Sequence, residues 1–183
     1  MVELGELSAF SVELEGLTTG QRLRWVWENL GPRVSFGTAF GPTGLVLLDI
    51  AQKETPELSV FTIDTGYMFE ETCELRDKIA SRYGIDIEVL VPENSVEDQE
   101  RIHGKALYSR DPDLCCAMRK VAPLRGKLSH LDGWVTSIRR DQSETRKDTR
   151  IVDGYWFDSG HQVVKVNPMA DWTKKQVWDY VLK

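Results

Sequence analysis

Two adjacent cysteines, followed within one helical turn by two basic residues, are the feature of the sequence best suited to chemistry. Cys115 and Cys116 precede Arg119 and Lys120. Nearby positive charge favours the thiolate, the form that attacks electrophiles and binds zinc, copper(I) or iron–sulfur clusters. Neighbouring cysteines on a helix point in different directions, which is untypical of two thiols buried on one apolar face. The pattern indicates a reactive or metal-binding centre, with two inert structural thiols as the alternative.

The cysteine count limits what that centre can be. Three cysteines at irregular spacing make no disulfide framework and favour a reducing, cytoplasmic setting. Cys73 shares a predicted helical stripe with Phe69, Ile79 and Tyr83, so we expect it to fill the core. A soft-metal site normally needs four ligands, and the cysteines alone do not supply four.

Length and composition predict one domain over residues 1–183, with residues 1–32 as an N-terminal packing-helix region. The capping-box spacing in Thr18–Gln21 predicts where its helix begins. The longest apolar runs are too short to cross a membrane. Residues 1–20 contain four Glu and neither Lys nor Arg, which is unlike a secretory signal.

Charge is unevenly distributed along the chain. The formal net charge is -6, which argues against general nucleic-acid binding. Between Cys115 and Arg150, however, nine Lys or Arg stand against four Asp or Glu. A basic island in an acidic chain suggests a site for a small anion rather than for a polyanion.

A glycine-rich turn follows the first predicted strand. The strand begins near Val34, and the turn extends to Gly44, before an apolar helical run over residues 45–51. A strand that passes through such a turn into a helix aims backbone N–H groups at one point, which is a common way to hold phosphate. The turn lacks the Gly-Lys-Ser/Thr of a Walker A loop, and a plain tight connection is the alternative.

A second buried strand, residues 58–63, leads directly into Asp64-Thr65-Gly66. A helix with Glu70 in its first turn and Gly84 after its end follows, and residues 85–91 give a third strand. These strand-helix-strand units predict an α/β fold, a mostly parallel twisted sheet with helices on both faces. Ligands of such sheets bind at the carboxyl ends of the strands, where both turns fall, so the phosphate interpretation gains support.

A charged helix is predicted from Asn94-Ser95 to about Tyr108. His103 lies within it, and we expect a surface or packing residue there rather than a metal ligand. The proline within Arg110–Asp113 then ends the helix before the cysteine pair.

An arginine-rich loop follows the strand predicted at residues 134–138. It contains Arg139, Arg140 and Arg146, whose guanidinium forks suit phosphate and sulfate oxygens. Interspersed acidic residues leave a solvated, salt-bridged loop as the alternative. A strand over residues 163–166 precedes a final helix without a stop signal, so we expect a further C-terminal segment.

Together these motifs resemble the adenylyl-sulfate and 3'-phosphoadenylyl-sulfate reductases of assimilatory sulfate reduction. The resemblance extends from about Val34 to the end of the sequence, and four motifs in the family's order are its most specific parts: Asp64-Thr65-Gly66, Cys115 to Lys120, Arg139 to Arg146, and Val166 to Trp172. It implies the adenine nucleotide alpha-hydrolase-like fold. It also implies a cytoplasmic oxidoreductase that uses thioredoxin or glutaredoxin, and it leaves a homo-oligomer open.

The resemblance assigns roles to individual residues. Lys120 and Arg146 match the catalytic cations beside the phosphosulfate and the nucleotide. Cys115 and Cys116 match two of the four ligands of a [4Fe-4S] cluster. The implied substrate-binding positions are Thr38, Ala39, Phe40 and Gly41 in the phosphate-side loop, Ile63, Asp64, Thr65 and Gly66 at the adenosine pocket, and Ser137, Arg139 and Arg140 in the arginine loop.

The cysteine pair marks the branch that is usually specific for adenylyl sulfate, so the implied reaction is thioredoxin-dependent reduction of adenylyl sulfate to sulfite and AMP. The family's later Cys-x-x-Cys pair and nucleophilic cysteine have no counterpart in residues 1–183, and we expect them in a C-terminal catalytic segment. Without that cysteine, this chain alone is expected to be inactive. Thr43-Gly44 replaces acidic residues and Ser137 replaces a glycine usual in relatives, so we expect crowding near the adenosine.

Three other functions remain open. A reductase of 3'-phosphoadenylyl sulfate shares nearly every motif. An ATP pyrophosphatase-type adenylating enzyme shares the sheet but needs a Ser-Gly-Gly-x-Asp-Ser loop, which the sequence lacks. A non-catalytic nucleotide- or cluster-binding sensor explains the missing nucleophile. Neither nucleic acid nor a membrane is expected as a partner.

Overall fold

The computed structural model describes residues 7–157 and 160–183. Residues 1–6 of the predicted N-terminal packing region lie outside the described residues. Within the described ranges, every helix falls short of the length and apolar character that crossing a membrane requires.

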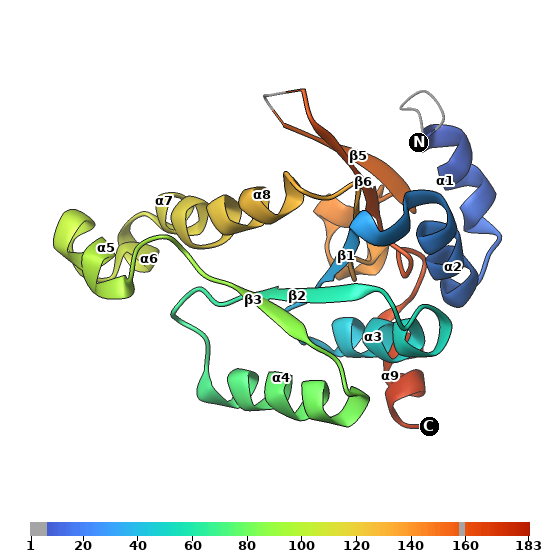
Figure 1. The fold of residues 1–183 in the computed structure, drawn as a ribbon, viewed down its shortest axis with the longest axis horizontal. Helices are drawn as coiled ribbons and strands as arrows, with labels where there is room; N and C mark the ends of the chain where they lie inside the picture. Colours follow the sequence, from blue (N-terminus) through green and yellow to red (C-terminus); the bar gives the residue numbers. More distant parts are fainter. Residues whose placement is uncertain (1–6, 158–159) are drawn as a thin grey trace. The chain divides into compact units, whose positions relative to one another are not determined.

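The chain forms two compact units. The middle unit comprises Phe61–His130, and the terminal unit comprises the flanking segments up to Val60 and from Leu131. The strand order is β3-β2-β1-β4-β6-β5 (Figure 1). This is an α/β arrangement with a mostly parallel sheet, and it confirms the predicted fold class.

The central strands of the terminal unit are short and mostly buried. β1 (Val34–Gly37) pairs in parallel with β4 (Gly133–Val135), which pairs in parallel with β6 (Gln162–Val166). Their largely apolar sequences suit strands that are covered on both faces. β5 (Val152–Trp156) lies antiparallel to β6 as a hairpin (Figure 1). The sequence did not predict β5, because its Asp and Gly are residues that strands disfavour.

The α-helices of the terminal unit are α1 (Leu7–Glu15), α2 (Thr19–Leu30), α3 (Pro42–Glu54) and α9 (Lys174–Val181). Thr18 and Gln21 complete the predicted capping box of α2, and Gly31 ends the helix at a φ of 62°. Thr173 caps α9; the sequence had left Asp171 and Thr173 open as the cap. Short 3-10 turns lie at Gly31–Arg33, Arg140–Gln142 and Glu144–Arg146.

A buried arginine links the start of the terminal unit to its end. Arg22 is 1% exposed and donates to both carboxylate oxygens of Asp171, at 2.6 and 2.9 Å. It also donates to the carbonyl oxygens of Leu14, Glu15 and Pro168. The guanidinium is therefore both neutralised and fully hydrogen-bonded, which is the condition under which a buried charge is tolerated.

The middle unit contains the end of β2 (Ser59–Ile63), followed by α4 (Glu70–Tyr83), β3 (Ile87–Leu90), α5 (Val96–His103), α6 (Leu107–Arg110), α7 (Pro112–Cys116) and α8 (Ala122–Leu128). Gly84 ends α4 in the left-handed conformation, as predicted. A π-helical turn over Ala117–Val121 joins α7 to α8. Such turns widen the helix and often occur at functional sites.

Two predictions for this unit were wrong. The charged helix ends at His103 rather than near Tyr108, because Gly104 and Ala106 adopt positive φ angles of 80° and 53°. The apolar stripe of α4 does not include Phe69, which is 77% exposed. Cys73 on the same helix is half-buried, so it borders the core instead of filling it.

Candidate functional site

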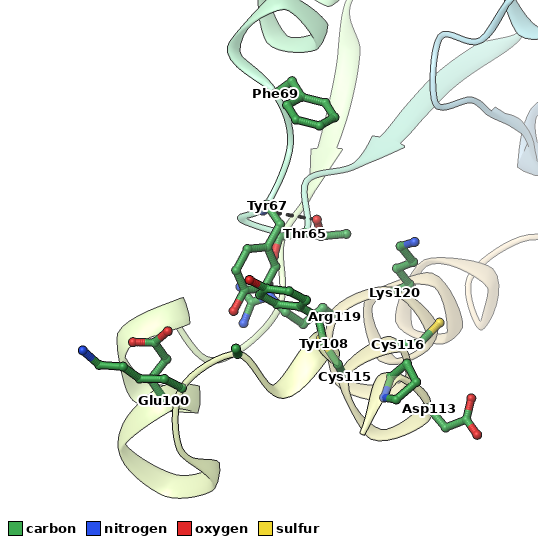
Figure 2. Close-up of a pocket in the computed structure, with 13 residues that line it drawn as sticks. Thr65, Tyr67, Phe69, Glu100, Tyr108, Asp113, Cys115, Cys116, Arg119 and Lys120 are labelled. Carbon is green, nitrogen blue, oxygen red and sulfur yellow. Dashed lines mark hydrogen bonds between the residues drawn. The ribbon is translucent and has the colours of Figure 1, made fainter. Parts of the chain in front are cut away.

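The cysteine pair lines a hollow of about 980 Å³ in the middle unit, here called the cysteine hollow. It brings together four residues that the sequence predicted, Thr65, Cys115, Cys116 and Lys120. The other lining residues are Tyr67, Phe69, Glu100, Lys105, Ala106, Tyr108, Pro112, Asp113 and Arg119. Figure 2 shows Cys116 and Lys120 on the same helical segment, with Arg119 beside the ring of Tyr67.

Helix α7 presents the two thiols differently. Asp111 caps the helix by accepting a hydrogen bond from the Leu114 N–H at 3.0 Å. Cys115 is 7% exposed and Cys116 is exposed, as expected for neighbouring positions on a helix. Both are free thiols that line the hollow.

Thiolates are the ligands that iron–sulfur clusters use, so this pair fits as half of a donor set. Residues 7–157 and 160–183 contain no group of three or more His, Cys, Asp or Glu side chains placed to hold a metal ion. The described residues therefore supply two adjacent thiols and no closed metal site.

Arg119 lies in the π-helical turn and is 4% exposed. Its Nε donates to the Thr65 carbonyl oxygen, and its Nη1 lies 3.2 Å from Oε1 of the fully buried Gln99. Nη1 also reaches the carbonyl oxygens of Asn94 and Ser95 at 3.3 and 3.4 Å. The side chain thus connects the cysteine helix to the turn after β2 and to the start of α5.

The Asp64-Thr65-Gly66 turn is held by its own side chains. Oδ1 of Asp64 accepts the Gly66 N–H at 2.8 Å, and Oγ1 of Thr65 accepts the Tyr67 N–H at 3.3 Å. Gly66 has a φ of 74°, a conformation that glycine adopts without strain. Ile63, which precedes the turn, and Asp64, its first residue, are partly buried. The predicted adenosine-pocket residues therefore form one ordered turn at the carboxyl end of β2.

Two tyrosines that sequence reasoning missed lie beside this turn. The rings of Tyr67 and Tyr108 meet edge to face, with centroids 5.4 Å apart, and the Arg119 guanidinium lies 5.4 Å from the Tyr67 centroid. Burial raises the pKa of Tyr67, and the Arg119 charge opposes that rise. Tyr67 directly follows the Asp64-Thr65-Gly66 motif, which was the available signal for it, whereas Tyr108 lies seven residues before Cys115 and had no such signal.

In the terminal unit, the predicted phosphate-side loop connects β1 to α3. Oγ1 of the buried Thr38 accepts the Phe40 N–H at 3.1 Å, and Phe40 is 4% exposed with a φ of 57°. Ala39 and Gly41 are exposed. A Cβ at Gly44 would lie 2.5 Å from Oγ1 of Thr38, so this position requires glycine for the close approach of the loop to α3.

The loop opens on a hollow of about 380 Å³, here called the loop hollow. Four predicted residues line it: Ala39, Gly41, Ser137 and Arg139. Thr43, Gly44 and Gln142, which lie within the predicted motifs but were not assigned to binding, also line it, and sequence reasoning missed Pro42, Lys174, Val177 and Trp178. Lys174 and Trp178 belong to α9, whose packing against α3 the sequence did not reveal.

The three loop arginines have different surroundings. Arg139 is 7% exposed, donates to Thr43 at 3.1 Å and pairs with Asp141 at 2.5 Å. Arg140 pairs with Glu15, and that contact raises the pKa of the Arg140 guanidinium. Neither Arg140 nor Arg146 lines the loop hollow, and both predicted roles remain predictions.

Arg146 is exposed and bonds Gln142. The charge of Arg146 also affects Lys165 in β6. Burial lowers the pKa of Lys165, Asp153 on the neighbouring strand raises it, and the Arg146 charge lowers it. The Lys165 ammonium lies 5.3 Å from the Trp134 ring. Arg146 is therefore a cation whose hydrogen-bond partner, Gln142, is neutral, and Lys165 is a second, partly desolvated cation close enough to feel its charge.

Comparison with known proteins adds a sequence relationship to this geometry. A family model described as the phosphoadenosine phosphosulfate reductase domain matches residues 33–183. The chain is 36% identical over 177 residues to an adenosine 5'-phosphosulfate reductase of Salinibacter ruber, an alignment that covers 97% of this chain and 69% of the relative. It is 38% identical over 180 residues to a phosphoadenosine 5'-phosphosulfate reductase of Gloeobacter violaceus, covering 91% and 73%.

A solved structure shares the fold over the full length of the chain. The crystal structure of phosphoadenylyl-sulfate reductase from Candida auris, a phosphate complex, superposes with a TM-score of 0.84 at 27% sequence identity. The match covers 100% of this chain and 87% of that one. Relatives named for the nucleotide with and without the 3'-phosphate are therefore similar to this chain to nearly the same degree.

Proposed function

Because this chain belongs to the phosphoadenosine phosphosulfate reductase family, we propose that it binds adenylyl sulfate for thioredoxin-dependent reduction to sulfite and AMP. The chain is an oxidoreductase of sulfate assimilation. The observation that carries the choice of substrate is the cysteine hollow, in which Cys115, Cys116 and Lys120 line one space with Thr65 of the nucleotide turn. That combination of thiols and cations suits a sulfonated nucleotide better than a neutral one.

The proposed reaction has two steps. A cysteine thiolate attacks the sulfur of adenylyl sulfate, the sulfur–oxygen bond to AMP breaks, and an enzyme S-sulfonate forms. One thiol of reduced thioredoxin then attacks the cysteine sulfur and releases sulfite, and its second thiol resolves the mixed disulfide. The two electrons come from the thioredoxin dithiol, which ends as a disulfide, and the enzyme thiol is regenerated. The nucleophile is not assigned to Cys73, Cys115 or Cys116.

Lys120 is proposed to stabilise the charge that develops on the leaving phosphate. It is exposed to the cysteine hollow and makes no ion pair with any described residue, so its ammonium is available to a ligand. Fixed charges aimed at a developing anion are usually the largest single contribution to such catalysis. Arg146 is proposed to contact the nucleotide, since its recorded partner is the neutral Gln142.

Ala39, Gly41, Ser137 and Arg139 line the loop hollow and are proposed to bind the nucleotide there. Thr38 and Phe40, which are buried, are proposed to shape the loop. The close packing of Thr38 on Gly44 fixes the loop, and Arg139 supplies a buried positive charge. Asp141 offsets part of that charge. We therefore expect this hollow to contribute shape and hydrogen bonds more than net attraction.

Cys115 and Cys116 are proposed as two ligands of a [4Fe-4S] cluster. The family and the pair of free thiols support this assignment, and the remaining ligands would come from outside the described residues. When bound, the cluster would act through its charge and its position near Lys120 rather than by carrying electrons. Loss of absorbance during turnover at the rate of sulfite release would contradict that role.

A second candidate substrate is 3'-phosphoadenylyl sulfate, because relatives with that name match at similar identity. Titration calorimetry with adenylyl sulfate, 3'-phosphoadenylyl sulfate and ATP separates the possibilities. We expect adenylyl sulfate to bind at least ten times more tightly than ATP. Equal or tighter ATP binding would instead support an adenylating enzyme. Comparing kcat/KM for sulfite release by the full-length protein that includes the nucleophilic cysteine, with the two sulfonated nucleotides and reduced thioredoxin, then identifies the substrate.

A further inference from the structure

We infer that the Nη2 group of Arg119, between Gly66 and the first residue of α5, is a contact for a phosphate or sulfate oxygen of the nucleotide. The identity of that ligand rests on the proposed function. Arg119 was not among the residues that the sequence or the family resemblance assigned to substrate binding.

Hydrogen bonds occupy only part of the Arg119 guanidinium. Nε donates to Thr65, and Nη1 has the carbonyl oxygens of Asn94 and Ser95 and the amide oxygen of Gln99 within reach. Nη2 has no hydrogen-bond partner within residues 7–157 and 160–183. Two N–H donors of a side chain that is only 4% exposed are therefore left for a ligand.

The positive charge of Arg119 has no carboxylate partner among the described residues. Each of its recorded acceptors is a neutral oxygen, and Gln99 occupies the place where a glutamate would complete an ion pair. Buried charges in proteins are normally paired, and leaving one without a counter-ion is costly. An anionic ligand would satisfy both the free donors and the charge.

The backbone beside Nη2 leaves room for such a ligand. A Cβ at Gly66 would lie 2.9 Å from Nη2 and 2.9 Å from Cγ2 of Val96, so any side chain there would cover the group. Gly66, Val96 and Arg119 line a hollow of about 450 Å³, here called the turn hollow. Its other residues are Asp64, Val91, Pro92, Asn94, Ser95 and Glu97.

The turn hollow lies at the N-terminus of α5, where backbone N–H groups attract anions. Ser95 satisfies the Asp98 N–H through its hydroxyl, which leaves those of Val96 and Glu97 for a ligand. The carboxylates of Asp64 and Glu97 line the same hollow and oppose an anion, although Asp64 already accepts the Gly66 N–H. Arg119 supplies the opposing positive charge and is the most buried of the three charged groups.

Gln99→Glu tests this inference because it adds a counter-charge while keeping the shape and the hydrogen bond to Nη1. AMP and adenosine are titrated into the wild-type protein and the variant by calorimetry, and melting temperatures are recorded. We expect AMP affinity to fall about 10- to 100-fold, the range for a hydrogen bond to a charged group. Adenosine affinity and melting temperature should be retained, which a purely structural role of Arg119 does not predict.

Gln162→Glu in β6 is the matched control, since it changes the net charge equally in the other unit. Unchanged AMP affinity in Gln99→Glu, or equal losses for AMP and adenosine, would overturn the inference. If Gln99→Glu does not fold, Arg119→Lys decides with the same ligands. A lysine keeps the charge but cannot bond Thr65 and Gln99 while still presenting two free donors. The affinity for AMP should therefore fall about tenfold, and the affinity for adenosine should stay the same.

Inorganic sulfate separates this inference from the proposed function. If the wild-type protein does not bind AMP, the proposed function fails. The inference is then tested with inorganic sulfate at constant ionic strength. Sulfate should then raise the melting temperature of wild type more than that of Gln99→Glu, and equal or absent shifts would overturn the inference. If AMP binding depends on Arg119 but no sulfonated nucleotide is reduced, the inference stands and the proposed function falls.

Discussion

Buried arginines in the two units are handled in opposite ways. In the terminal unit, Arg22 pairs with Asp171 and Arg139 pairs with Asp141. In the middle unit, Arg119 is equally buried but is held by backbone carbonyls and one amide. All three make several hydrogen bonds, so donor count does not distinguish them. The difference lies in the counter-charge.

The difference in counter-charge shows which of these arginines is available to bind an anion. A guanidinium that already faces a carboxylate contributes hydrogen bonds and packing, but its field is largely cancelled. Arg119 keeps its positive field and two free donors, and Lys120, one residue later, makes no ion pair within residues 7–157 and 160–183. The middle unit is therefore the part in which an anion should matter most, whereas paired arginines of the terminal unit should matter most for folding.

The largest expected effect is on stability, and it tests whether the paired Arg22 matters for folding. Arg22→Met should lower the free energy of unfolding by about 3–5 kcal/mol, because it leaves Asp171 and three carbonyl oxygens without their donor. Chemical denaturation measures the loss. Arg24→Met is the control, since Arg24 is half exposed in a surface pair with Glu54 and should cost no more than about 1 kcal/mol. Equal losses would show that burial and pairing do not separate these arginines.

The next effect concerns Lys120, a lysine of the cysteine hollow that makes no ion pair with a described residue. In the full-length protein that includes the nucleophilic cysteine, Lys120→Gln should lower the rate of sulfite release about 100- to 1,000-fold, the usual cost of removing a fixed charge that faces a developing anion. The melting temperature should stay unchanged, because Lys120 is exposed. Lys78→Gln is a matched control on α4, where Lys78 pairs with Glu74 on the surface. A rate within threefold of wild type for Lys120→Gln would remove it from the catalytic residues.

Gly66→Ala sharpens the same comparison with a smaller effect. The φ of 74° should cost about 1–2 kcal/mol of folding free energy in any residue with a Cβ. The added Cβ, 2.9 Å from Nη2 of Arg119, should also weaken AMP binding. Gly126→Ala in α8 is the control, because nothing lies within 4 Å of its added Cβ. It should stabilise the protein by about 0.5–1 kcal/mol and leave AMP affinity unchanged.

Local sequence signals predicted the positioning elements well. The capping box of α2, the strand that ends at Ile63 and the glycine that ends α4 depend on residues within a few positions of one another. The same holds for the opposite exposures of Cys115 and Cys116, which follow from helix geometry. These features were confirmed because neighbours along the chain determine them.

Long-range partners could not be predicted in this way. The carbonyl that Arg119 bonds belongs to Thr65, 54 positions away, and Arg140 meets Glu15 across 125 positions. A single sequence shows that an arginine is present but not whether a carboxylate will neutralise it. The helix predicted to reach Tyr108 failed for a related reason, because the positive φ of Ala106 belongs to a turn that Arg110 holds by bonding to His103 and Lys105.

The smallest expected effect tests a hydrogen-bonded cluster of the terminal unit at high pH. The Tyr180 hydroxyl donates to Asp49 at 2.6 Å, and burial together with that bond raises the pKa of Tyr180 above its ordinary 10.0. The folded state therefore holds this proton more tightly than the unfolded state, so the stabilisation is complete below pH 10 and is lost as pH rises through the folded-state pKa. Tyr180→Phe should lower the free energy of unfolding by about 0.5–1.5 kcal/mol at pH 8. The difference in this free energy between variant and wild type should become smaller above pH 10. Urea denaturation from pH 8 to 11 measures both, and a constant gap would show that the bond does not favour the protonated tyrosine.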